Sequence, residues 1–138
     1  MEFTDNEIHV TSVLADRVGR CYTRRGLART LGISEDDIIE LTDALAVLGC
    51  PTSDDEFVYP AFQVHDGRLV DGLADVLGLL SEGNDDPWTW ALWLASTPTP
   101  RDGAALPHIE TLIAGHREAV MTAALHTAAA WRGDPHGL

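Results

Sequence analysis

Most of the chain shows the spacing of hydrophobic residues that is typical of amphipathic helices. The clearest example follows Ser34, where apolar side chains recur at intervals of three and four residues. These positions are Ile38, Leu41, Leu45 and Leu48. Ser34 and Asp37 form a variant of the capping box, a typical start of a helix. Gly49 and then Pro51 predict where this helix ends.

The same spacing predicts six further helices, several with clear end signals. Thr23 suits the cap of the helix that ends at Gly32, and Asp86 suits the cap of a helix whose first residue is Pro87. Gly115 separates the last two helices. The predicted helices cover residues 6–18, 24–31, 69–80, 87–95, 107–114 and 117–131.

One segment between these helices is extended instead. Residues 57–64 alternate in polarity, are rich in aromatic residues and are interrupted by Pro60; Asp66-Gly67 then predicts a tight turn. Because this element is short, the predicted fold class is all-α. We expect a helix-turn-helix-like module over residues 1–55, a short extended connector over 56–70, and a helical domain over 71–138.

Charge changes the interpretation of the N-terminal module. The chain has 22 acidic residues against nine basic ones, all of them arginine, and a net charge of −13. Such a charge repels the phosphate backbone of nucleic acid at long range. It favours either a basic protein partner or simply solubility.

The second helix of the helix-turn-helix has the wrong charge for reading DNA. Its outward positions are Glu35, Asp36, Glu40 and Asp43. A recognition helix needs hydrogen-bond donors toward bases and phosphates, and carboxylates oppose docking. Arg24, Arg25 and Arg29 on the preceding helix are candidates for contact with the DNA backbone, although a solvated face is the simpler interpretation. DNA binding is therefore doubtful.

Nothing in the sequence indicates an enzyme or a cofactor site. No histidine has a partner at metal-ligand spacing, and no phosphate loop, dinucleotide fingerprint or nucleophile elbow occurs. Cys21 and Cys50 are expected to be reduced thiols. No apolar run approaches the length of a membrane span, and the polar, acidic start does not resemble a secretory signal, so we expect a cytoplasmic protein.

Tryptophan is concentrated in the C-terminal half. Trp88, Trp90 and Trp93 lie within one short helix, and Trp131 lies near the end of the chain. One helix face cannot bury three indoles, and tryptophan is enriched at interface hot spots. The alternative is that all four rings lie in the core or in a homodimer seam. Because residues 88–95 are apolar nearly all round, we expect a homodimer or a larger oligomer.

Several short motifs, in order, resemble the Xre/MbcA/ParS family of antitoxins. The resemblance covers roughly residues 20–131, and the acidic recognition helix departs from it. Beyond the helix-turn-helix, the matching residues are Tyr59-Pro60-Ala61-Phe62-Gln63, Asp66-Gly67-Arg68, Asp86-Pro87-Trp88, Trp93-Leu94, Thr97-Pro98, Gly103, Pro107, Leu112, Ala114-Gly115 and Glu118-Ala119-Val120.

This resemblance implies that residues 71–138 form a toxin-binding domain. The expected partner is a toxin with a RES domain that degrades NAD, and the antitoxin blocks its NAD pocket by direct contact. A transcriptional autoregulator, or a phage-type interaction protein with a different partner, remains the alternative. The Gly- and Pro-containing tail after Trp131 is a candidate plug, or else an end without a role. The candidate partner-binding residues are Trp88, Trp90, Trp93, Arg117, Trp131, Arg132, His136 and Leu138.

Overall fold

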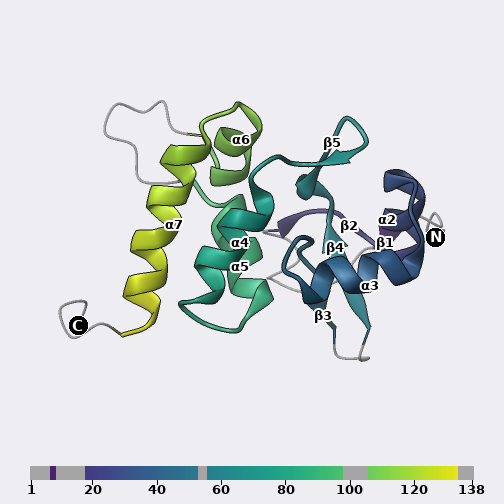
Figure 1. Cartoon of the computed structure of the whole chain (residues 1–138), viewed down its shortest axis with the longest axis horizontal. Helices are drawn as coiled ribbons and strands as arrows, with labels where there is room; N and C mark the ends of the chain where they lie inside the picture. The colour runs from purple at the N-terminus through teal and green to yellow at the C-terminus, as the bar shows by residue number, and fades with distance from the viewer. Residues whose placement is uncertain (1–6, 9–17, 53–55, 98–105, 134–138) are drawn as a thin grey trace.

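The computed structural model describes residues 7–8, 18–52, 56–97 and 106–133. Its elements alternate between short strands and helices (Figure 1). In chain order they are β1 (Glu7–Ile8), β2 (Cys21–Tyr22), α2 (Arg24–Leu31), α3 (Glu35–Asp43), β3 (Cys50–Pro51), β4 (Phe57–Pro60), the 3-10 turn η1 (Ala61–Gln63), β5 (Val64–His65), β6 (Arg68–Leu69), α4 (Leu73–Ser81), α5 (Pro87–Ala95), α6 (His108–Ile113) and α7 (Arg117–Trp131).

The prediction of an all-α fold is wrong. The helices are joined by a four-stranded antiparallel sheet in the order β1-β2-β4-β3 and by the two-stranded pair β5-β6, so the fold is mixed α and β. Most of these strands are only two residues long, too short to show an alternating pattern. Their partners are also distant in sequence, as where Cys21 lies opposite Pro60.

The larger sheet forms a wall between two groups of helices (Figure 1). Successive residues of a strand point to opposite faces. On β4, Val58 belongs to the core shared with α4, α5, α6 and α7, whereas Tyr59 belongs to the smaller core beneath α2 and α3. Val47 and Leu48 divide in the same way. The two cores therefore meet back to back across the sheet.

A buried amide fixes the connection between these halves. Gln63, at the end of η1, is fully buried. Its side-chain oxygen accepts from the backbone N–H of Leu48 at 2.8 Å. Its side-chain nitrogen donates to the carbonyls of Leu48 at 2.9 Å and of Pro60 at 3.0 Å. The amide thus satisfies backbone groups at two points of the buried chain, which would otherwise lack partners.

The helix after Ser34 ends earlier than the sequence predicts. α3 stops at Asp43, not next to Gly49, because Leu45 adopts a left-handed conformation with φ 61°. The N–H of Ala46 bonds to the carbonyl of Leu41, and that of Leu45 to the carbonyl of Thr42. These two bonds define a Schellman motif, which glycine usually closes. After the reversal, Val47 enters the smaller core and Leu48 the larger one.

Most of the other local predictions are confirmed. Thr23 caps α2, Ser34 and Asp37 form a complete capping box, and Asp86 caps α5 ahead of Pro87. α7 has the predicted bounds. The Asp66-Gly67 turn joins β5 to β6 with positive φ at both residues, as a type I′ turn requires. The predicted first helix lies largely outside the described residues, but its positions 7–8 form β1.

Glycine allows the loop after α4 to approach α7 closely. A Cβ built on Gly83 would lie 2.7 Å from the Cα and 2.8 Å from the carbonyl oxygen of Ala128. Those atoms belong to the α7 backbone and cannot move independently. Gly78 differs, since a Cβ built there in mid-helix meets nothing within 4 Å.

We therefore expect opposite effects from two alanine substitutions. Gly83→Ala should lower the free energy of unfolding by about 1–3 kcal/mol, because an added methyl forces α7 away. Gly78→Ala should raise it by about 0.5–1 kcal/mol, because alanine favours the helix. Urea denaturation of both variants measures these changes. Equal effects of the two substitutions would contradict the close contact at Gly83.

Candidate functional site

The three tryptophans of α5 all use their indole N–H groups inside the chain. Trp88 donates to the carbonyl of Pro51 on β3 at 2.7 Å, and Trp90 donates to the side chain of Asn84 at 2.9 Å. Trp90 is buried, whereas Trp88 and Trp93 are half-buried. A partner protein would therefore meet only parts of the Trp88 and Trp93 rings.

Trp93 connects three helices. Its ring stacks on His108 of α6 with centroids 3.7 Å apart and planes 8° apart, and its N–H donates to Thr127 of α7 at 3.0 Å. His108 is one of the few buried polar residues in the described part of the chain. Burial lowers the pKa of His108, because it penalises the imidazolium. Sequence reasoning gave this histidine no role, since its neighbours in space are far away in sequence.

The other predicted partner-binding residues lie on α7 or beyond it. Arg117 donates to Asp75 of α4 at 2.5 Å, and Arg132 lies 4.0 Å from Glu82. Trp131 is half-buried against the larger core. The structure thus brings the predicted residues of α5 and α7 around one bundle. His136 and Leu138 lie outside the described residues, as does all of the predicted plug after Gly133.

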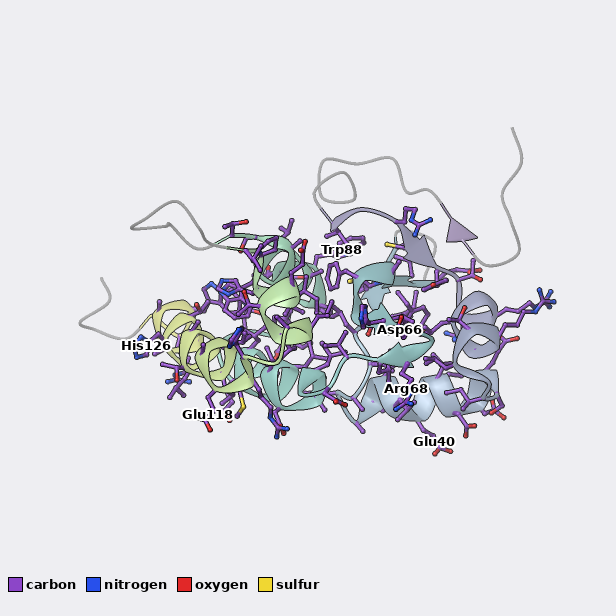
Figure 2. All side chains as sticks on the ribbon, turned by 90° about the horizontal axis from the view of Figure 1, so that it is seen from above. Glu40, Asp66, Arg68, Trp88, Glu118 and His126 are labelled. Carbon is purple, nitrogen blue, oxygen red and sulfur yellow. The ribbon has the colours of Figure 1, made fainter. Side chains whose placement is uncertain are left out.

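The outer face of α7 has no charged side chain over most of its length. Between Glu118 and Arg132 the helix contains no Asp, Glu, Lys or Arg. Leu125, in the middle, is 49% exposed, the highest value among the large hydrophobic residues that the structure describes. Figure 2 shows Glu118 and His126 on the outer surface of this helix. The other exposed residues here are Ala119, Thr122 and Ala130. The sequence shows that residues 119–131 carry no Asp, Glu, Lys or Arg, but only the structure shows which of them face the solvent.

The helix-turn-helix has the acidic surface that the sequence predicts. α3 is followed by the antiparallel pair β3-β4. Glu40 points away from the body of the protein (Figure 2), and Asp36 and Asp43 are also exposed. The surface that would face DNA is therefore lined by carboxylates.

The candidate DNA-contacting arginines on α2 have partners within the chain. Arg24 donates from Nε to the hydroxyl of Tyr59 at 3.3 Å. Arg25 lies 3.9 Å from the carboxylate of Glu35, and Arg29 also has an interaction partner. The ion pair of Arg25 is solvent-exposed and therefore weak. These arginines would therefore have to give up contacts within the chain in order to bind DNA.

The remaining candidate sites offer little chemistry. Burial raises the pKa of Cys21 to about 11 and raises that of Cys50 further, so both free thiols stay protonated at neutral pH. A cleft of about 310 Å³ between the β5-β6 hairpin and α6 has charges of both signs, from Arg68, Asp66 and Asp71. Among the described residues no cluster has the composition of a metal site, and no helix has the length and apolarity to cross a membrane.

Comparison with known proteins identifies a fold but no family. No family model matches the chain, and no curated protein matches it. A similar solved structure is the NMR structure of a protein called Rv2175c. It superposes with a TM-score of 0.63 at 21% sequence identity, over 78% of this chain and 80% of that chain. The two chains share a fold. At this identity the similarity carries no information about function.

We expect His108 to make stability depend on pH. Because its pKa is lower in the folded chain than the ordinary value near 6.5, the unfolded chain takes up the proton first as pH falls. The contribution of neutral His108 to the free energy of unfolding is therefore complete above about pH 6.5 and is lost progressively as the pH falls below it. The variant His108→Phe keeps an aromatic ring on Trp93 but cannot titrate. Urea melts between about pH 7.5 and 5.5 should show wild type losing stability relative to this variant; parallel curves would refute the assignment.

We also expect the isolated protein to bind duplex DNA weakly or not at all. The exposed carboxylates of α3 repel phosphates, and the arginines of α2 are partly engaged. A gel shift on the DNA upstream of its own gene, at about 150 mM salt, measures this. A sequence-specific shift below micromolar concentration would show that the expectation is wrong. The complex with a basic partner should be assayed separately, because such a partner could cover the acidic face.

Proposed function

We propose that this chain is a binding protein of the antitoxin type, which inhibits a toxin by direct contact. The observation that carries the proposal is the uncharged outer face of α7, with Leu125 49% exposed at its centre. Solvent-facing helices normally carry charged side chains, so an uncharged face with an exposed leucine is a candidate interaction surface. No catalytic group is needed for this function.

The packing of α7 supports its use as a rigid binding element. Val120, Ala124 and Ala128 of α7 are buried in the protein. Trp93 donates to Thr127 near the middle of the helix. A partner would therefore meet a preformed surface and would not have to order it, which lowers the entropic cost of binding. α5 is less suited to this role, since Trp90, Ala91 and Leu94 are buried within the protein.

The identity of the partner rests on the resemblance to Xre/MbcA/ParS antitoxins, which implies a RES-type toxin that consumes NAD. The net charge of −13 favours a basic surface on that toxin. A role as transcriptional regulator is the second candidate, because α2 and α3 form a helix-turn-helix that is followed by the antiparallel pair β3-β4. The acidic face of α3 makes it the weaker of the two.

We predict that Leu125→Glu weakens toxin binding roughly tenfold or more, because it places a charge in a desolvated contact. The matched control is Leu106→Glu, since Leu106 is 48% exposed but lies outside α7. Both variants are co-expressed with a RES-type toxin, the class that the resemblance implies, and cellular NAD is measured. Wild type and Leu106→Glu should preserve NAD, whereas Leu125→Glu should not. If wild type itself fails to preserve NAD, toxin inhibition is excluded; if Leu125→Glu protects fully, the α7 face is excluded.

A further inference from the structure

A second exposed surface lies on α3 and β4. Ile39 is 40% exposed and Phe57 is 36% exposed. Thr42 lies three residues after Ile39 on α3; its hydroxyl donates to the carbonyl of Ile38 at 2.6 Å, and its methyl group and the Phe57 ring both flank Gly49. A Cβ built on Gly49 would lie 3.1 Å from that methyl and 3.2 Å from the ring, so both groups flank the same point. We name Ile39, Thr42 and Phe57 the α3-β4 strip.

Carboxylates border this strip at the C-terminal end of α3, where negative charge destabilises a helix. Glu40 and Asp43 lie in the last turn of α3, which has no basic residue. The carboxyl end of a helix carries a partial negative charge and favours cations. These two acids therefore act against the stability of their own helix. Residues that reduce stability in this way are often retained for function.

The acidic character extends over the whole module around the strip. No Lys or Arg occurs between Arg29 and Arg68. The same stretch contains Glu35, Asp36, Asp37, Glu40, Asp43, Asp54, Asp55, Glu56 and Asp66. The exposed acids Asp36, Glu40 and Asp43 lie on the same helix as Ile39 and Thr42, so a basic occupant gains from them.

We propose that the α3-β4 strip binds a basic, amphipathic segment of another protein. Hydrophobic side chains of the segment cover Ile39 and Phe57, while its Arg or Lys residues pair with Asp36, Glu40 and Asp43. An amphipathic helix lying on an apolar strip is a common mode of peptide recognition. A second copy of this chain fits less well, because each copy carries a net charge of −13. Nucleic acid fits least, because its phosphates face the same carboxylates.

This surface is separate from the one proposed for the toxin. α3 and α7 lie toward opposite ends of the molecule (Figure 1), and Glu40 and His126 mark the two surfaces in Figure 2. The inference therefore holds or fails independently of the function proposed for α7.

The test uses a fluorescently labelled probe peptide of about 18 residues, with leucines along one helical face and arginines along the other. A scrambled peptide of identical composition, with no amphipathic face, is the control probe. Anisotropy titrations use the full chain. The first peptide should bind at least roughly tenfold more tightly than the scrambled one, and amide NMR shifts should concentrate on α3 and β4.

Two pairs of variants separate apolar docking from general charge attraction. Ile39→Ser should weaken binding of the amphipathic peptide roughly tenfold, whereas the similarly exposed control Leu106→Ser should not. The double variant Glu40→Gln/Asp43→Asn should weaken binding and its salt dependence while stability is unchanged or higher. The control Asp85→Asn/Glu110→Gln removes the same charge from exposed sites elsewhere and should have little effect.

Three outcomes would overturn the proposal. If the two peptides bound with equal affinity, the protein would be attracting any polycation and would not be recognising an amphipathic helix. If the test and control variants lost affinity equally, the peptide would bind outside the α3-β4 strip. Light scattering that shows a dimer in wild type but not in Ile39→Ser would identify a second copy as the occupant.

Discussion

The architecture depends on the three hydrogen bonds of one buried amide. Burying an amide without partners costs several kcal/mol, so Gln63 is tolerated only where its acceptor and its donors are all used. It bonds to both backbone groups of Leu48 and to the carbonyl of Pro60. Those contacts hold the chain after α3 against the turn that follows β4. The sheet can then present one face to each core, and the helix-turn-helix is fixed relative to the C-terminal bundle.

The features that could be predicted from sequence are those that arise locally. A cap such as Ser34 with Asp37, or a type I′ turn at Asp66-Gly67, depends on residues one to three positions apart, and the structure contains both. The sheet could not be predicted in the same way. Most of its strands are only two residues long. They also pair residues that are distant in sequence, such as Cys21 and Pro60, which lie on either side of α2 and α3. The Schellman motif at Leu45 was hidden because leucine stands where glycine is expected.

The candidate surfaces show the same division. The acidic face of α3 follows from helical spacing alone, and the structure has it. The tryptophans were chosen for their residue type, but type does not reveal whether an indole N–H already has an acceptor such as Pro51 or Thr127. Ile39 was overlooked because it lies outside the hydrophobic repeat of its helix. An apolar residue off that repeat is a sequence signal that a hydrophobic side chain lies outside the core face of the helix.

The position of the sheet between the two helical groups has a geometric consequence. Because α3 and α7 lie toward opposite ends of the molecule, ligands on the two faces would be held at separate positions (Figure 1). A protein that holds two ligands at once raises the effective concentration of each near the other, often into the millimolar range for short connections. The chain would then act as a rigid spacer, and the distance between its bound molecules would be set by the sheet rather than by either binding face.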